Sequence, residues 1–254
     1  MTTTTINRKG PGALVSALML AEMRVFLRQP VMVSLTLLMP IGLLGITALA
    51  EVTDVPALWA QIAGRDVVAT LCITVYFVAL NTITARRHTL ALKRLRTTAL
   101  PSLGIIVGLL TPPLLVGFFQ VAALLVGLGF LGAPVPDSQV LVAVSTLAGM
   151  VIAALAGVVT SAFTATPEKA QWTMLPLFVA AMGAASILPT LEDGPLSLGL
   201  RFVPLVANGH LVAAGWVTSG VPGQAISVDL GIMAAWILVL GVLAWRTFRW
   251  DRRQ

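Results

Sequence analysis

The fold is decided by one stretch, RRHTLALKRLRTTALP, which occupies residues 86–101. It holds five of the sixteen Lys and Arg residues and no Asp or Glu, and apolar runs flank it on both sides. A cationic segment of this kind cannot lie in hydrocarbon, and between membrane spans it is retained on the cytoplasmic side. The stretch therefore predicts the orientation of every span around it.

The composition excludes an ordinary soluble protein. Hydrophobic residues make up 57% of the chain, charged residues 10%, and the mean hydropathy is +0.95, whereas globular domains have about 25% charged residues. We therefore expect a single membrane domain over residues 1–254. A net charge of +6 would suggest nucleic acid in a soluble protein, but here the basic residues flank apolar runs. Membrane topology explains them, and no nucleic-acid partner is expected.

Helical membrane spans need about 20 apolar residues to cross a hydrocarbon core about 30 Å thick. The runs that approach this length are residues 31–50, 67–85, 103–131, 140–163, 172–188 and 230–245. Pro112 and Pro113 lie inside the third run and predict a kink or a break there. The sequence thus predicts an all-α polytopic protein with six transmembrane helices.

The segments between these runs differ in character. Residues 13–29 predict an amphipathic helix that is too short to span, with Arg24 and Arg28 together on one face as anchors in the inner headgroup layer. Residues 51–64 predict an acidic loop. Residues 189–229 contain four prolines and are too apolar for a free loop. They predict two short helices that dip into the outer leaflet, packed on protein.

The distribution of charge supports this topology. With residues 86–101 inside, fourteen Lys and Arg residues lie on the cytoplasmic side and only Arg65 and Arg201 lie outside. Such a bias is typical of the positive-inside rule. We therefore expect an even number of spans with both termini in the cytoplasm.

The predicted spans carry no ionisable side chain in their interiors. Ion-coupled transporters normally bind the driving ion with such groups at mid-depth, so a proton-driven carrier is disfavoured. The chain also lacks a GxxxxGK[ST] phosphate loop and any loop large enough for a nucleotide-binding domain. If this protein pumps, ATP hydrolysis belongs to a partner chain.

Enzyme signatures are missing as well. His88 and His210, the only histidines, fall on opposite sides of the membrane in this topology, so a shared metal site is not expected. Neither GxSxG nor HExxH occurs. We assign no catalytic residue and no metal, and expect that the chain is not an enzyme.

Four stretches together resemble one known family. They are LAEMRVFLRQPVMVSLTLLMP (residues 20–40), HTLALKRLRTTALPSLGIIVGLL (88–110), TATPEKAQ (164–171) and RFVPLVANGHLVAAG (201–215). Their order and spacing resemble the membrane subunits of ABC-2 type transporters, which include bacterial drug and polysaccharide exporters and are related to the ABCG fold. The resemblance covers nearly the whole chain. One departure is the basic run Arg86-Arg87-His88, where the family commonly has an acidic residue before its coupling helix.

The resemblance implies an assembly in the bacterial inner membrane. A six-span permease would pair with a second copy or with a paralogous permease, and two ABC ATPase subunits would bind ATP and Mg²⁺; no cofactor is expected in this chain. Residues 1–29 would be a cytoplasmic tail with an interfacial elbow helix, 30–247 the six-span core, and 248–254 a second tail. Residues 189–223 would form an external re-entrant hairpin between the fifth and sixth spans.

The resemblance also implies roles for individual residues. The coupling helix would be residues 88–98 and a second contact with the ATPase would be residues 164–170. The expected coupling residues are His88, Leu92, Lys93, Arg94, Leu95, Arg96, Glu168 and Lys169. The spacing of Leu92, Leu95 and Ala99 predicts an apolar stripe that could fill a cleft on the partner. Alternatively, the basic residues only set topology and meet anionic lipid headgroups.

The sequence says little about which residues line a translocation path. Its candidates are Asn81, Pro112, Pro113 and Gln120, for which helix packing is the alternative explanation. The expected function is export of an amphipathic drug-like or lipidic molecule from the cytoplasm or inner leaflet. A permease for a polysaccharide or other polar cargo, a membrane scaffold or assembly subunit without transport activity, and a membrane-embedded enzyme remain as alternatives.

Overall fold

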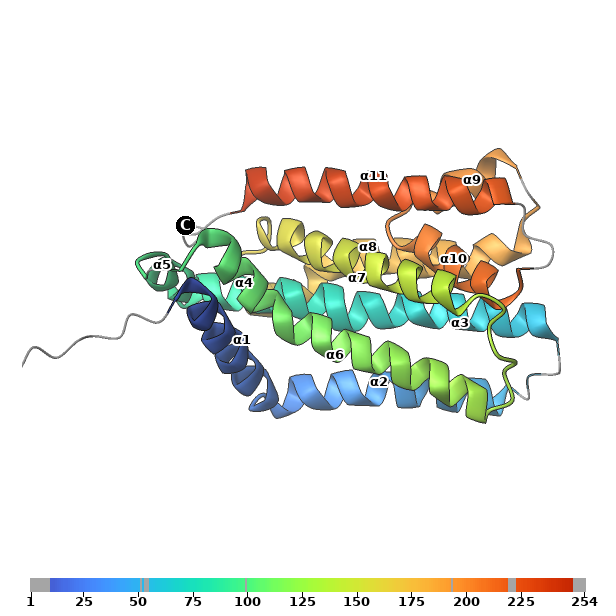
Figure 1. The fold of residues 1–254 in the computed structure, drawn as a ribbon, viewed down its shortest axis with the longest axis horizontal. Coiled ribbons are helices and arrows are strands. Elements are labelled where there is room, and N and C mark those ends of the chain that lie inside the picture. The colour runs from blue at the N-terminus through green and yellow to red at the C-terminus, as the bar shows by residue number, and fades with distance from the viewer. Residues whose placement is uncertain are drawn as a thin grey trace, which may run out of the picture.

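The computed structural model describes residues 10–50, 52, 55–98, 100–192, 194–218 and 223–248 (Figure 1). These residues form helices and no strand, which confirms the predicted all-α class. The helices are α1 (Pro11–Leu27), α2 (Pro30–Leu49), α3 (Pro56–Thr70), α4 (Phe77–His88), α5 (Ala91–Arg96), α6 (Ser102–Phe130), α7 (Gln139–Ser161), α8 (Pro167–Ile187), α9 (Pro195–Arg201), α10 (Val206–Trp216) and α11 (Gly223–Thr247). A π-helical segment, Leu71–Tyr76, joins α3 to α4, and a 3₁₀ turn, Leu188–Thr190, follows α8.

Five helical stretches are long and apolar enough to cross a membrane. They are Pro56–His88, Ser102–Phe130, Gln139–Ser161, Pro167–Thr190 and Gly223–Thr247. A sixth is reached if α9 and α10, which meet at 107°, count as one broken span. Within the 20-residue helix α2, the segment Thr36–Leu49 is apolar but shorter than a membrane span. The structure therefore confirms a multi-pass membrane protein with five to six candidate spans.

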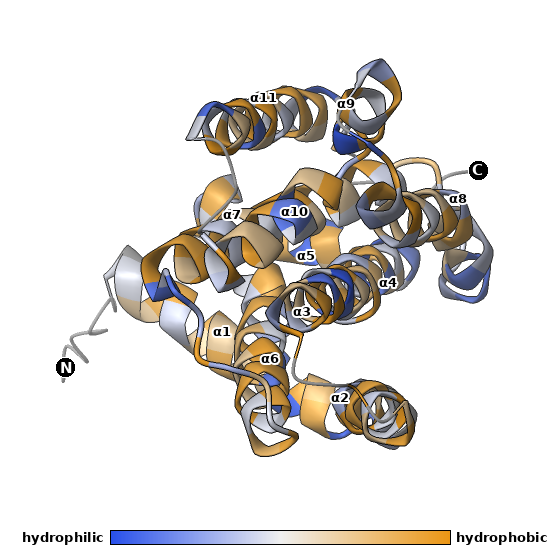
Figure 2. Ribbon diagram, turned by 90° about the vertical axis from the view of Figure 1, so that its right-hand side faces the viewer, coloured by the Kyte–Doolittle hydropathy of each residue, from blue (hydrophilic) through white to orange (hydrophobic). Residues whose placement is uncertain are grey.

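The long helices run side by side along one axis, with α5 at one end of the bundle and α9 and α10 at the other (Figure 1). The view along that axis shows mostly hydrophobic ribbon on α2, α6, α8 and α11 (Figure 2). In the apolar window of Pro56–His88, 83% of the residues are buried, against 22% in those of α8 and α11. Pro56–His88 is therefore the central helix, and the peripheral helices leave apolar faces outward.

Two glycines allow the closest approach between helices. The most extensive helix pair is α3 with α10, and Gly64 of α3 faces Gly209 of α10. A Cβ atom on Gly64 would overlap the Gly209 carbonyl group, and one on Gly209 would lie 3.0 Å from the Gly64 carbonyl oxygen. Small residues at helix crossings let backbones meet in this way in membranes, where packing rather than water drives association.

The predicted loop over residues 51–64 is wrong for most of its length. Helix α3 begins at Pro56, because proline is well suited to the first helical position. Trp59, Ile62 and Ala63 are then buried in the core. The second span is consequently longer than residues 67–85, and sequence hydropathy missed its start because the adjoining Arg65 and Asp66 lowered the local average.

The prolines of α6 do not break it, although the sequence predicted a kink or a break. Pro112 and Pro113 are buried inside a helix assigned without interruption from Ser102 to Phe130. Membrane helices tolerate internal prolines when neighbouring groups satisfy the freed backbone. Pro112 and Pro113 free the carbonyl oxygens of Gly108 and Leu109, whereas the nearby Thr111 hydroxyl donates to the Val107 carbonyl oxygen at 2.9 Å.

The region before the last span contains two short helices, as predicted for residues 189–229. Leu205, with φ of 73°, turns the chain between α9 and α10. The Trp236 indole Nε1 donates to the Phe202 carbonyl oxygen at 2.9 Å, which ties this turn to α11. Helix α11 begins at Gly223, before the predicted start at residue 230, so Asp229 lies inside the helix.

Candidate functional site

The basic end of the bundle is built by a reversal of the chain. Helix α4 ends at His88, and Leu90 adopts the left-handed conformation with φ of 57°. This turn lets α5 begin at once and pack against the end of α4. A non-glycine residue in this region of φ is uncommon and is sustained only where the surrounding contacts require it. The predicted coupling segment is therefore a short helix held in a defined position.

Helix α5 presents its charges outward and its leucines inward. Lys93, Arg94 and Arg96 are exposed, whereas Leu92 is fully buried and Leu95 is half-buried against the core. The prediction that Leu92 belongs to an apolar stripe for a partner is therefore wrong, because other residues of the same chain bury its side chain. Ala99 lies outside the described residues. Leu92 positions the helix, and the cationic side chains form the accessible surface.

Truncation of Leu92 tests this anchoring. We expect Leu92→Ala to lower the free energy of unfolding by about 2 kcal/mol, because it leaves a cavity in a packed site. Arg94→Ala, on the exposed face of the same helix, should change it by less than about 0.5 kcal/mol. Thermal unfolding in detergent measures both. Equal stability of the two variants would contradict the inward placement of Leu92.

Side chains from segments far apart in the sequence make contacts at the end of the bundle where α5 lies. Arg86 donates to the Glu22 carboxylate of α1 at 2.6 Å, and the buried Arg87 donates to the Thr164 carbonyl oxygen in the turn between α7 and α8. Helix α8 also packs against α4. Helix α1 and the turn between α7 and α8 thus both contact the end of α4, from which α5 follows. Sequence reasoning missed Glu22, and its only signal was a lone acid among basic residues.

Residues 164–170, the second predicted contact, include the start of a helix. Helix α8 starts at Pro167, so Glu168 and Lys169 stand exposed in its first turn. An acidic residue is favoured there by the helix dipole. His88 at the end of α4 and Glu168 at the start of α8 therefore lie at the same end of the bundle, with Lys169 adjacent (Figure 1). Arg24 and Arg28 are exposed on α1.

The predicted path residues do not gather around a cavity. Gln120 is buried; its amide nitrogen donates to the Thr36 carbonyl oxygen of α2, and its amide oxygen accepts from Thr74 in the π-helical segment. Pro112 and Pro113 are buried and Asn81 is half-buried. None of these four lines any of four pockets in the described part of the chain. Helix packing accounts for Gln120.

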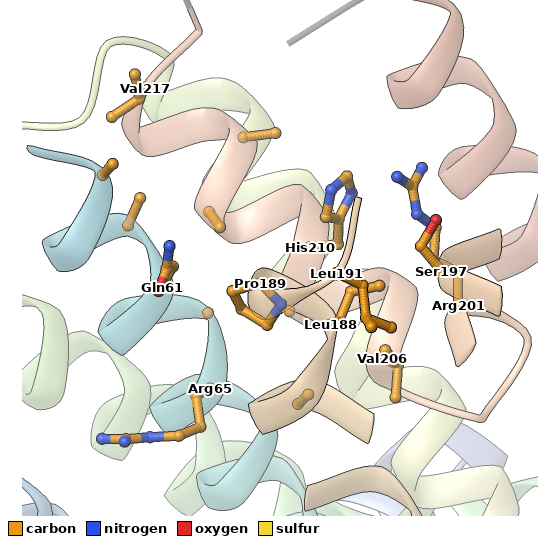
Figure 3. Close-up of a pocket in the computed structure, with 17 residues that line it drawn as sticks. Gln61, Arg65, Leu188, Pro189, Leu191, Ser197, Arg201, Val206, His210 and Val217 are labelled. Carbon is orange, nitrogen blue, oxygen red and sulfur yellow. The ribbon is translucent and has the colours of Figure 1, made fainter. Parts of the chain in front are cut away.

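A polar cluster that the sequence did not predict lies at the opposite end. Asp229 of α11 is fully buried, and its carboxylate lies 2.5 Å from His210 Nδ1 and 3.7 Å from an Arg201 guanidinium nitrogen. His210 lies within α10. It and Arg201 line a pocket of about 370 Å³ (Figure 3). The buried Asp229 carboxylate needs the basic side chains of Arg201 and His210 beside it, because an uncompensated buried charge is strongly destabilising.

Metal ligation has no visible basis in the described residues, where no three His, Cys, Asp or Glu side chains come together. His88 ends α4, beside α5, and His210 lies in α10, at the other end of the bundle (Figure 1). The single cysteine, Cys72, is buried within the central helix.

Comparison with known proteins adds no family assignment, because no protein-family model, no curated protein and no solved structure matches this chain.

Proposed function

We propose that this chain is the membrane-spanning subunit of an ATP-driven exporter of the ABC-2 type. The observation that carries the proposal is the exposed cationic face of α5, formed by Lys93, Arg94 and Arg96. It stands at one end of a bundle that is otherwise strongly apolar. A short helix packed against α4 and α6 is suited to receive motion from a cytosolic ATPase and pass it to the spans as a rigid-body shift.

The remaining elements have roles in this proposal. Helix α1 is the interfacial elbow, with Arg24 and Arg28 in the inner headgroup layer, and both termini are cytoplasmic. Helices α9 and α10 form the external re-entrant hairpin. The outward apolar faces of the peripheral helices meet lipid and a second permease subunit, either an identical copy or a paralogue. ATP and Mg²⁺ bind the partner ATPase, and this chain itself is not an enzyme.

The cargo is an amphipathic drug-like or lipidic molecule. It enters between two subunits from the cytoplasm or the inner leaflet and leaves past the hairpins. The support is chemical: the spans offer apolar and weakly polar walls, and such walls bury the greater part of a small ligand's surface.

Charge reversal on α5 tests the proposal. The chain is co-purified with ABC ATPases of its host, and affinity and ATP turnover are measured in nanodiscs. Arg94→Glu should weaken the complex about tenfold, and reversal of Lys93, Arg94 and Arg96 together should abolish assembly, because like charges then face each other across the contact. The fold should survive, since all three side chains are exposed.

Arg246→Glu, which reverses an exposed charge in the last turn of α11, is the matched control and should assemble normally. Unchanged affinity and turnover in the triple variant would contradict the proposal. Labelling of a Thr97→Cys variant from outside sealed cells would contradict it as well, since it would place α5 at the exterior. A scaffold without transport activity would bind the ATPase but show no cargo-stimulated turnover.

A further inference from the structure

The central helix, Pro56–His88, changes its hydrogen-bond pattern partway along. Between α3 and α4 the segment Leu71–Tyr76 is π-helical, and the Phe77 N–H donates to the Cys72 carbonyl oxygen, five residues earlier. Turns of this kind are rare and are frequently found at functional sites. The segment, LCITVY, contains neither proline nor glycine, so contacts with its neighbours rather than its own backbone keep it in this form.

Two glycines on neighbouring helices make room for the π-helical turn. A Cβ atom on Gly117 of α6 would overlap the Val75 side chain, and one on Gly157 of α7 would lie 2.7 Å from the Tyr76 carbonyl oxygen. Larger residues at these two positions would therefore press directly on the segment.

The two halves of the central helix are held by different parts of the bundle. Helix α3 meets α10 at Gly64 and Gly209. Helix α4 is bonded to α1 through the Arg86 side chain and to the turn between α7 and α8 through that of Arg87. The segment Leu71–Tyr76 therefore joins two halves that have separate anchors.

Gln120 of α6 contacts this segment and α2 at the same time. Pro40 inside α2 has no N–H, so the Thr36 carbonyl oxygen lacks the donor that an α-helix would give it. The Gln120 amide nitrogen donates to that oxygen, and its amide oxygen accepts from the Thr74 hydroxyl. Gln120 is 4% exposed and Thr74 is fully buried. Removal of the amide would take away both bonds where there is no water to replace them.

Thr74 donates away from its own helix. A threonine inside a helix commonly bonds to a carbonyl oxygen one turn earlier, as the Thr70 hydroxyl does to the Asp66 carbonyl oxygen at 2.8 Å. The Thr74 hydroxyl instead bonds to Gln120 on α6. The π-helical segment is thus bonded sideways to a helix that is itself bonded to α2.

We propose that Leu71–Tyr76 is a hinge of the central helix and that Gln120 holds it in the π-helical form. When Thr74 is released, the segment returns to the α-helical pattern of hydrogen bonds. This changes the number of residues per turn, so α4, together with α5 at its end, turns relative to α3. The inference goes beyond the proposed transport function, because the hinge belongs to this chain alone and opens without ATP or an ATPase.

Cys72 reports on the hinge directly. It is the only cysteine of the chain, lies within Leu71–Tyr76 and is fully buried, so a maleimide reacts with it only when the segment opens. The rate of labelling is measured on the full chain, purified in a neutral detergent. Gln120→Met, which keeps the size of the side chain and removes the amide, should raise this rate about tenfold.

Pro40→Ala tests the link to α2. Alanine restores the N–H that donates to the Thr36 carbonyl oxygen, so this oxygen no longer depends on Gln120. In the Pro40→Ala background, Gln120→Met should therefore raise the rate only about threefold. Pro176→Ala is the matched control: Pro176 lies inside α8, and no described side chain donates to the Trp172 carbonyl oxygen that it frees. In that background the effect of Gln120→Met should stay about tenfold.

Ser145→Cys in a Cys72→Ala background distinguishes opening of the hinge from general unfolding. Ser145 is fully buried in α7, and its labelling should not change with Gln120→Met. If elution volume and Tm show that Gln120→Met is not folded, Thr74→Val removes only the bond to the hinge and should also speed the labelling of Cys72. An unchanged rate at Cys72 overturns the proposal, as does an equal rise in the Pro40→Ala background or in the Ser145→Cys protein. None of these outcomes bears on docking at α5.

Discussion

Gly64→Ala is expected to lower the free energy of unfolding by about 3 kcal/mol or more, as overpacking does when no side chain can yield. The new Cβ atom would overlap the carbonyl group of Gly209, which is backbone and cannot change rotamer. Helices α3 and α10 would have to separate, although they form the most extensive helix pair of the bundle. Thermal unfolding in detergent measures the loss.

Gly183→Ala is the matched control for this variant. Gly183 lies within α8, and a Cβ atom there would meet nothing within 4 Å. The substitution is the same, so any general effect of alanine on a helix is present in both variants. We expect a change of less than about 0.5 kcal/mol or a small gain, because alanine favours helix. Equal Tm values for the two variants would show that α3 and α10 do not approach as closely as described.

Glu22→Arg is expected to detach α1 from α4 and to cost about 4 kcal/mol, the scale for leaving one partner of a buried ion pair uncompensated. The Glu22 carboxylate is 8% exposed and the Arg86 side chain 25%, so water screens the pair poorly. Two arginines would then face each other beside α5. Within the proposed function, ATP-driven transport should fall with stability, because the Glu22–Arg86 pair holds the end of α4, against which the docking helix α5 packs.

A charge swap distinguishes loss of the Glu22–Arg86 ion pair from a general loss of stability. Glu22→Arg combined with Arg86→Glu restores opposite charges at the same two positions, and we expect most of the lost stability to return in a double-mutant cycle. Glu192→Arg makes the same change at an exposed site and should be nearly neutral. If the swapped protein were no more stable than Glu22→Arg alone, the ion pair would not be what joins α1 to α4.

Much of the fold follows from the sequence because partition into a bilayer depends on the average character of a continuous segment. The apolar runs, the basic stretch over residues 86–101 and the prolines of residues 189–229 sufficed to predict the long helices, the short helix α5 and the pair α9 and α10. The same averaging placed the start of the second span too late, since it registered the charges of Arg65 and Asp66 but not their mutual pairing.

Tertiary structure alone decided which faces are buried and which charges meet. That Leu92 turns into its own subunit, that Glu22 pairs with Arg86, and that Asp229 joins Arg201 to His210 all depend on contacts between residues far apart along the chain. The physical reason is that hydropathy and helical period specify that a segment is helical and how apolar it is. The neighbours of a given side chain are set only when the helices pack.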